Sequence, residues 1–570
     1  MGIKHFFMWF KQNYSEYMTP LKLNEKVEIH IDNLMIDMNG LFHNSAQKIY
    51  KYGNHKAHKR LLQRRKNTFR RLQQQIDVFK DVCNSIEKLF EISRPQKRLI
   101  LCVDGPAPLS KQCQQRQRRF RSAMESSTHA VFDSNSITPG TKFMDYLSKY
   151  IDWYIRKRIS ESSDWQKIEI IFSNEKVAGE GEYKAMQYVR YYGNMDETFC
   201  INGLDADLIM LALSTRVQNF YILREDLYDP ANEYFCIDIG NVRKVLSKKI
   251  EWKSKKYQYN PRSGIDDFVF LCFMVGNDFL PHIPSIEIIE GGIELLLNLY
   301  KDVCSSYGHL TKILDDGSIQ FRVSSTKIFL TTIGNHEKDN YEEKLKRRKC
   351  YFEDKILDCC STQQKTNWIV DIEKYNKLYM LKHFGENPDI QKICHDYLEG
   401  MQWVLTYYTC KVPNWKWLFK YHYAPPASIL AKYIDSFTFS SYGITFPSTP
   451  FQQLMSVLPP KSAHLIPAPL CNYILDKDSP LAKYCPKEIS IDLSGKRREW
   501  EGILMLPIVD FDLVRKCYFK DLDNVNPRDS KRNITGKTFI YQYNSQYQRL
   551  FKSYYGNINK CCVEIKKLNL

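Results

Sequence analysis

Short apolar runs alternate with helix-like stretches through the first half of the chain. The runs occupy residues 27–37, 98–103, 168–173, 198–202 and 220–223. Strands that alternate with helices predict an α/β fold with a mostly parallel sheet. Ligand sites in such sheets lie beyond the carboxyl ends of the strands. The residues that follow each run are therefore the first candidates for a functional site.

Carboxylates recur at these positions. One ends the first run, one follows the second, two begin the helix after the third, and two lie in the turn after the fourth. One more stands where an apolar helix at residues 265–275 stops. The seven are Asp37, Asp104, Glu180, Glu182, Asp205, Asp207 and Asp278. We expect them to converge at one edge of the sheet.

The turn at residues 203–207 (GLDAD) has two interpretations. Residues two apart do not face each other within a regular helix, but a turn can direct Asp205 and Asp207 toward one point. Alternatively, one aspartate caps the helix and the other lies in its first turn, where the helix dipole favours negative charge. The pair alone does not decide between them, and the repetition of acidic turns favours a shared site.

Seven carboxylates in one pocket cannot all stay ionised without a counter-charge. Divalent cations supply it, and hard oxygen ligands select Mg²⁺ or Mn²⁺. Two such ions roughly 3.5–4 Å apart can activate water and stabilise the leaving oxygen in phosphodiester hydrolysis. The pattern therefore predicts a two-metal catalytic site in which all seven carboxylates are ligands.

The overall charge favours a polyanionic partner. The 570 residues carry a net charge of +17 and a pI near 9.0, which suits nucleic acid before a membrane surface. A generally basic soluble protein is the alternative. Seventeen cysteines without a Cys-x-x-Cys motif, a secretory signal or a membrane-length apolar run indicate a reducing intracellular compartment.

A basic segment follows the turn at Asp104. Lys111, Gln115, Arg118 and Arg119 are spaced i, i+4, i+7 and i+8, which places them on one helical face. Guanidinium groups bind phosphate in a bidentate manner, so the face suits a terminal phosphate. Residues 116–121 (RQRRFR) are basic all round, and a solvated helix face is the alternative.

These motifs resemble the Xrn-type 5′→3′ exoribonuclease family. The first block of similarity comprises residues 1–3, 6–7, 37–40 (DMNG), 103–105, 111–121, 137–141 (ITPGT), 179–182 (GEGE), 203–211 and 275–282 (VGNDFLPH). The second comprises residues 403–408, 412–417 (VPNWKW), 421–425 (YHYAP), 454–460, 495–496 and 500–507. The blocks cover most of the chain in the family's order.

The resemblance implies a PIN/FEN-like nuclease core with a mainly helical, aromatic-rich second region packed on it. The expected divisions are a catalytic core at residues 1–300, a variable charged linker at 301–369 and a second conserved region at 370–570. It implies that the seven carboxylates bind metal and that Lys111, Gln115, Arg118 and Arg119 hold the 5′-monophosphate of RNA. It also implies base stacking by His43 and by Trp415, with Trp417 as the alternative.

The implied activity is processive hydrolysis of single-stranded RNA from a 5′-monophosphate, releasing nucleoside 5′-monophosphates, in mRNA decay after decapping. A monomer in the cytoplasm rather than the nucleus is expected, with decapping factors as candidate partners. Because the sequence ends at residue 570, we expect a compact member without long C-terminal β-domains, of viral origin as one interpretation. Tyr183 departs from the family, which has His there.

Two other functions fit parts of the pattern. A structure-specific flap DNA nuclease has the same type of core and would carry the same carboxylates. A catalytically silent RNA-binding protein would need the basic surface alone. The second block, with Trp415 and Trp417, argues against the first, and the complete set of carboxylates argues against the second.

Overall fold

The computed structural model describes residues 3, 5–53, 68–125, 132–227, 229, 231–347 and 351–568. Residues 1 and 2 of the first block of similarity lie outside this part of the chain. The aromatic segment near the amino terminus forms α1 (Phe6–Tyr14), and Phe6, Trp9 and Phe10 are buried in the core.

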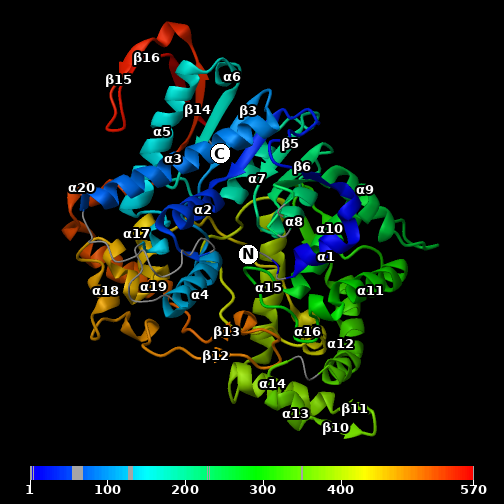
Figure 1. The fold of residues 1–570 in the computed structure, drawn as a ribbon. Helices are drawn as coiled ribbons and strands as arrows, with labels where there is room; N and C mark the ends of the chain where they lie inside the picture. Colours follow the sequence, from blue (N-terminus) through cyan, green and yellow to red (C-terminus); the bar gives the residue numbers. More distant parts are fainter. Residues whose placement is uncertain are drawn as a thin grey trace.

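A large sheet organises the molecule (Figure 1), with strand order β1-β7-β6-β5-β2-β3-β4-β14-β17. Its five central strands run parallel and are the five that the sequence predicts. They are β2 (Asn33–Asp37), β3 (Arg98–Cys102), β4 (Glu169–Ser173), β5 (Phe199–Asn202) and β6 (Phe220–Glu225). The α/β fold with a mostly parallel sheet is confirmed.

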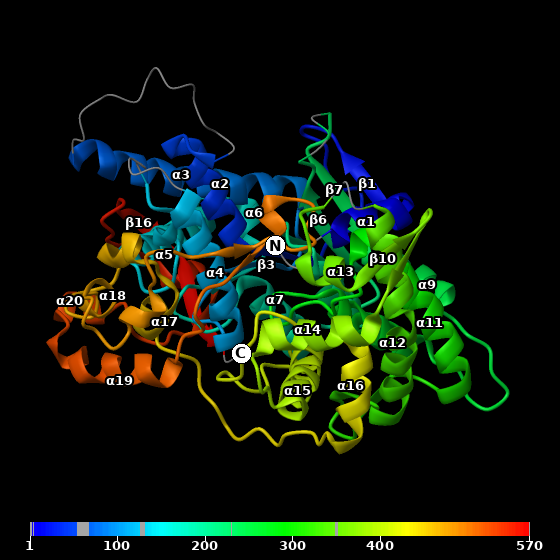
Figure 2. The ribbon, with the colours of Figure 1, turned by 90° about the horizontal axis from the view of Figure 1, so that it is seen from below.

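Both faces of the central strands are buried, which is why these strands read as continuous apolar runs. Met35, Ile100 and Ile201 point into one hydrophobic core, whereas Leu34 and Ile36 point into the other. Figure 2 shows α2 (Met38–Tyr50) and α3 (Thr68–Ser93) on one side of β3 and α7 (Gly181–Tyr192) on the other.

The second half of the chain packs onto this core. α15 (Ile390–Thr409) lies against α8 (Asp207–Ser214) and α10 (Pro261–Cys272), and α17 (Pro450–Val457) lies against α4 (Leu109–Glu125). Within residues 301–369, α12 (Val323–Lys346) packs on α16 (Ala427–Tyr433). The divisions at residues 300 and 369 stay a prediction.

Two strands from the end of the chain enlarge the sheet, which the sequence did not lead us to expect. β14 (Thr538–Tyr543) pairs antiparallel with β4, placing Ile540 opposite Ile171, and β17 (Val563–Leu568) pairs with β14. At the other edge, β7 (Tyr234–Asp238) and β1 (Met18–Leu21) are also antiparallel. The amino- and carboxyl-terminal halves therefore share one sheet.

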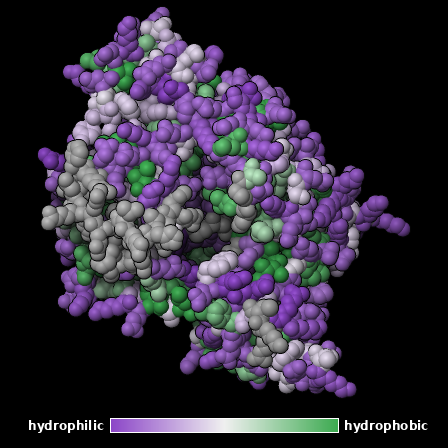
Figure 3. Space-filling view, viewed as in Figure 1, coloured by the Kyte–Doolittle hydropathy of each residue, from purple (hydrophilic) through white to green (hydrophobic). Residues whose placement is uncertain are grey.

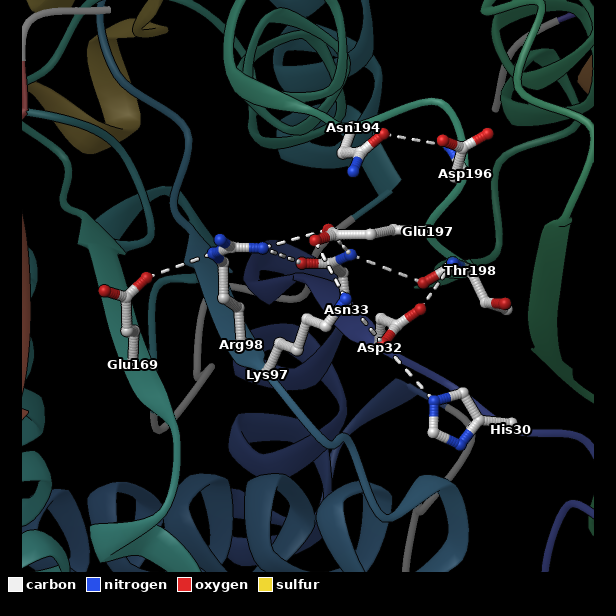
Figure 4. A network of polar contacts seen from close by, with 10 residues as sticks. All are labelled: His30, Asp32, Asn33, Lys97, Arg98, Glu169, Asn194, Asp196, Glu197 and Thr198. Carbon is white, nitrogen blue, oxygen red and sulfur yellow. Dashed lines mark hydrogen bonds and ion pairs between the residues drawn. The ribbon is translucent and has the colours of Figure 1, made fainter.

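A polar network ties together the amino ends of the central strands (Figure 4). Glu197 accepts hydrogen bonds from Asn33 Nδ2 at 2.8 Å and Arg98 NH1 at 2.9 Å, and its other oxygen lies 3.1 Å from Lys97 Nζ. Asp32 accepts from the Thr198 backbone N–H at 2.9 Å. This network lies at the end of the sheet opposite the predicted site.

The surface drawn in Figure 3 is mainly hydrophilic, with hydrophobic residues in small scattered groups. Among the described residues, no helix is both long and apolar enough to cross a membrane.

A buried carboxylate cluster as the candidate active site

The predicted carboxylates come together at the carboxyl ends of the parallel strands. Asp37 is the last residue of β2, Glu180 precedes α7, and Asp207 begins α8. A cavity of about 150 Å³ opens there. Six of the seven carboxylates line it, namely Asp37, Asp104, Glu180, Glu182, Asp205 and Asp278.

Asp207 lies beside this cavity in a tighter group. One carboxylate oxygen each of Glu182, Asp205 and Asp207 lies within 4.8 Å of the others, a spacing that could hold a metal ion. Glu182 and Asp207 are buried. Asp207 lies in the first turn of α8, as one interpretation of the 203–207 turn has it, but the N-cap is Ala206 and no aspartate side chain caps the helix. The carboxylate of Asp207 also lies close to those of Glu182 and Asp205, as the shared-site interpretation has it.

Several buried oxygens of this cluster lack partners. Asp37 Oδ1, Glu182 Oε2 and Asp207 Oδ1 have no hydrogen-bond partner among the described residues. Burying an unsatisfied carboxylate oxygen is costly. A divalent cation would satisfy such oxygens, because carboxylates are preferred ligands of hard cations. The donor set therefore fits a metal site.

The raised pKa values of two of these carboxylates also favour a bound cation. Burial and the charges of Asp104 and Asp205 raise the pKa of Asp37 well above its usual value. Burial and Asp205 raise the pKa of Asp207 to about 6. Carboxylates crowded in a low-dielectric site resist ionisation, so a bound cation would stabilise their charged forms.

Lys111 supplies a fixed positive charge inside the cluster. Its Nζ lies 2.7 Å from Glu180 Oε1 and 2.6 Å from Asp278 Oδ2. Burial lowers the pKa of Lys111, but the surrounding carboxylates outweigh it and raise the pKa well above the usual value. Burial, only partly offset by Lys111, raises the pKa of Glu180 to about 7. The predicted phosphate-binding and metal-binding groups therefore touch.

Side chains that the sequence did not single out hold the carboxylates in place. Tyr407 donates its hydroxyl to Glu180 Oε2 at 3.0 Å, and Tyr408 donates to Asp207 Oδ2 at 3.4 Å. Asn39 Nδ2 donates to Asp104 Oδ2 at 2.8 Å. Asn39 follows Asp37 within the 37–40 motif, and both tyrosines lie in the 403–408 motif. Their places in these motifs could have singled the three residues out from the sequence, but only the structure shows which carboxylates they contact.

Glycine is required where α7 meets β2. A Cβ on Gly181 would lie 2.5 Å from Asp37 Oδ1 and 2.9 Å from the Cys102 carbonyl oxygen. Gly179 has a φ of +103°, a conformation that residues with a side chain rarely adopt. The backbone of the GEGE sequence at residues 179–182 therefore passes directly beside Asp37 at the end of β2.

The basic helix α4 borders the same cavity. Lys111, Gln115 and Arg118 line it, whereas Arg119 is absent from the described lining. Arg119 is buried to about the same degree as Lys111 and Gln115; its NH1 donates to Gln115 Oε1 at 3.1 Å and its NH2 donates to Thr138 Oγ1 at 3.0 Å. Three of the four predicted phosphate ligands thus reach the cavity directly.

The predicted stacking residues are placed differently. His43 lines the cavity, and burial together with Arg118 and Arg119 lowers its pKa to about 3, which leaves a neutral ring. Trp415 is half-buried, and its backbone carbonyl accepts from the Leu109 N–H at the start of α4. Trp417 is buried, with its ring stacked on Trp403 at a centroid distance of 5.0 Å.

Comparison with known families decides the relationship. The model of the XRN 5′–3′ exonuclease amino-terminal domain matches residues 1–226, and the Xrn1 helical domain matches residues 258–377 and 373–568. The chain belongs to the XRN 5′–3′ exonuclease family. The two matches together cover most of the chain, so the resemblance seen in the sequence is confirmed.

Curated relatives agree with this assignment. The 5′-3′ exoribonuclease 1 of Saccharomyces cerevisiae is 28% identical over 98% of this chain and 46% of its own length. The 5′-3′ exoribonuclease 2 homolog of Drosophila melanogaster is 28% identical over 95% of this chain and 73% of its own. The human 5′-3′ exoribonuclease 1 is 27% identical, and 37% of it is covered. The chain thus spans less than half of two of these relatives.

Proposed function

We propose that this chain is a 5′→3′ exoribonuclease that degrades single-stranded RNA processively from a 5′-monophosphate and releases nucleoside 5′-monophosphates. The observation that carries the proposal is the contact of Lys111 with Glu180 and Asp278, because it joins a basic end-binding surface to the carboxylate cluster within one cavity. Family membership supports the reaction class.

The carboxylates are proposed to hold two divalent cations, Mg²⁺ or Mn²⁺. All seven would take part, and the unpartnered oxygens of Asp37, Glu182 and Asp207 support this assignment. When bound, such ions activate a water molecule and stabilise the leaving oxygen of a phosphodiester. Tyr407 and Asn39 contribute by fixing the orientations of Glu180 and Asp104.

The basic wall is proposed to hold the 5′-phosphate. Lys111, Gln115 and Arg118 offer N–H donors to the cavity, and Arg119 is bonded to Gln115. Charge-assisted hydrogen bonds of this kind favour a phosphate over a neutral hydroxyl. The neutral ring of His43 is suited to stacking on a base, and Trp415 is the proposed second platform, since stacking tolerates any sequence.

The test compares RNAs of one sequence that carry a 5′-monophosphate, a 5′-triphosphate or a 5′-hydroxyl, each incubated with Mg²⁺. We expect rapid loss of the monophosphate RNA, with mononucleotides as products and no short fragments. A circular RNA of the same sequence, which has no end, should survive. Equal decay of all three linear RNAs would contradict the 5′-end pocket, and cutting of the circle would contradict the exonuclease assignment. Preferential cutting of flap DNA would favour the rival nuclease.

We further propose a role in mRNA decay after decapping, as a monomer in the cytoplasm, because removal of a cap leaves the 5′-monophosphate that the pocket suits.

A further inference from the structure

A hydrogen-bonded chain connects the backbone after Asp104 to the wall of the phosphate pocket. The Ala107 N–H donates to Gln453 Oε1 at 2.8 Å, and Gln453 Nε2 donates to Gln115 Oε1 at 3.3 Å. Gln453 lies in α17, which packs against α4 from the second half of the chain. Its side chain is fully buried.

The backbone N–H of Ala107 fixes which atom donates and which accepts in each of these hydrogen bonds. An amide N–H only donates, so the oxygen of Gln453 must face Ala107 and its NH₂ must face Gln115. Gln115 therefore accepts the hydrogen bond of Gln453 through its side-chain oxygen. Arg119, whose guanidinium only donates, approaches the same oxygen at 3.1 Å and confirms this orientation. Two donors thus occupy the carbonyl oxygen of Gln115.

The remaining end of Gln115 determines what the pocket offers a ligand. Gln115 lines the cavity and its oxygen is already bonded to Gln453 and Arg119, so its NH₂ group is the part left for the ligand. The reverse orientation would place two donors against an NH₂ group and turn an acceptor oxygen toward the phosphate. A phosphate oxygen is an acceptor, so only the first orientation supports its binding.

We infer that Gln453 and Arg119 are positioning residues that lock the Gln115 amide with its NH₂ group toward the 5′-phosphate, so that selection of the phosphorylated end depends on α17. This inference rests on the proposed function. Arg119 is itself held by its buried bond to Thr138 Oγ1. The Thr138 hydroxyl in turn donates to the Asn135 carbonyl at 2.7 Å, which completes the support on that side.

The test replaces Gln453 with methionine, which has a similar volume and no hydrogen-bonding amide. The readout is the ratio of kcat/KM for 5′-monophosphate RNA to kcat/KM for 5′-hydroxyl RNA, in which the concentration of active protein cancels. We expect Gln453→Met to lower this ratio roughly three- to tenfold, the worth of one hydrogen bond. The change should appear mainly as a higher KM for the monophosphate RNA. A second variant, Gln453→Glu, keeps an acceptor for Ala107 but turns an acceptor toward Gln115, and should lower the ratio further.

Gln112→Met is the matched control. Gln112 is also a fully buried glutamine. Its Nε2 donates to the Ala107 carbonyl at 2.8 Å and to Ser448 Oγ at 3.3 Å, and not to Gln115. Gln112→Met should lose about as much stability as Gln453→Met, measured as the melting temperature. Its kcat/KM ratio should stay that of the unaltered chain. A ratio that falls equally in Gln112→Met and Gln453→Met would overturn the inference.

A double variant separates positioning from a direct effect. If Gln453 acts through Gln115, adding Gln453→Met to Gln115→Met should leave the ratio of Gln115→Met unchanged. A further fall in the double variant would overturn the positioning role. Failure of the proposed function would look different, because the unaltered chain would then show no preference for the monophosphate end.

Discussion

Lys111 and Asp278 form a buried ion pair, with Nζ 2.6 Å from Oδ2, at the boundary between the carboxylate cluster and the basic wall. The lysine also contacts Glu180, so one ammonium group compensates two carboxylates drawn from separate segments of the chain. This contact couples the charge of the proposed metal site to the geometry of the proposed phosphate pocket.

Lys111→Met should destabilise the protein strongly in the absence of divalent cations. Removing one partner from a buried ion pair leaves an uncompensated charge and costs roughly 3–5 kcal/mol. Added Mg²⁺ should restore more stability to this variant than to the unaltered chain, because the cation replaces the lost charge. Calorimetric melting with and without Mg²⁺ measures both effects. Lys149→Met, which breaks the more exposed pair with Asp145, should change little in either condition.

Asp205→Ala combined with Asp207→Ala should abolish hydrolysis while leaving RNA binding in place. Both carboxylates belong to the group that could hold a metal ion, and even outer partners of metal ligands affect activity 10- to about 100-fold. RNA affinity measured by fluorescence anisotropy in EDTA should stay within about twofold of the unaltered chain. Activity near the original level would refute the metal assignment. The paired change Asp315→Ala with Asp316→Ala, in an exposed turn, is the control.

Gly181→Ala should reduce activity through Asp37. The added methyl group would lie 2.5 Å from Asp37 Oδ1, so the carboxylate must move away from its neighbours. We expect kcat to fall at least about tenfold, because misplacing a reacting group by about an ångström is costly. Gly443→Ala, where nothing lies within 4 Å of the new atom, should be neutral. Equal kinetics for both variants would show that the position of Asp37 is unimportant.

Tyr407→Phe should lower turnover, whereas Tyr397→Phe, with a similar loss of stability, should not. Its hydroxyl donates to Glu180, whereas Tyr397, on the same helix, donates to the Pro281 carbonyl at 2.9 Å. Each Tyr→Phe change should cost about 1 kcal/mol of unfolding free energy. Only Tyr407→Phe should reduce kcat and weaken Mg²⁺ activation. A similar kinetic loss in Tyr397→Phe would point to a general packing effect.

Glu197→Gln should produce a pH-dependent loss of stability. Burial raises the pKa of Glu197, but the Asn33 hydrogen bond and the charges of Lys97 and Arg98 outweigh it, so the pKa lies below its usual 4.5. A lowered pKa stabilises the folded state above the unfolded-state pKa, and that stability is lost as pH falls through the folded-state pKa.

The Glu197→Gln difference should therefore be complete at pH 7, at roughly 1–3 kcal/mol, and should shrink progressively below about pH 4.5. Urea unfolding at several pH values measures it. Asp196→Asn, in the exposed turn beside it, is the matched control. A difference that grew as the pH fell would contradict the sign of the shift.

The sheet could be predicted because its strands follow from local pattern. A strand buried on both faces must be apolar throughout, and a carboxylate directly after it stands out against that background. Residues 33–37 and 98–102 show this clearly, and both lie in the centre of the sheet. β14 was missed because it is an antiparallel strand whose partner, β4, lies more than 360 residues away.

The candidate site, too, could be predicted from the sequence only in part. Spacing along α4 predicted a common face for Lys111, Gln115, Arg118 and Arg119, but it did not show that Arg119 would donate a hydrogen bond to Gln115 Oε1. Nor did any pattern connect Gln453 with Gln115, or Tyr407 with Glu180. Partners so distant in the sequence leave no periodic signal.

The sequence by itself determined which segments become strands, which residues carry charge, and that the acids stand at the strand ends. These properties follow from hydrophobic periodicity and residue chemistry, which act over a few neighbours. Only the tertiary structure decided that Lys111 lies between Glu180 and Asp278 and that α17 packs against α4, because those contacts depend on how distant elements pack together.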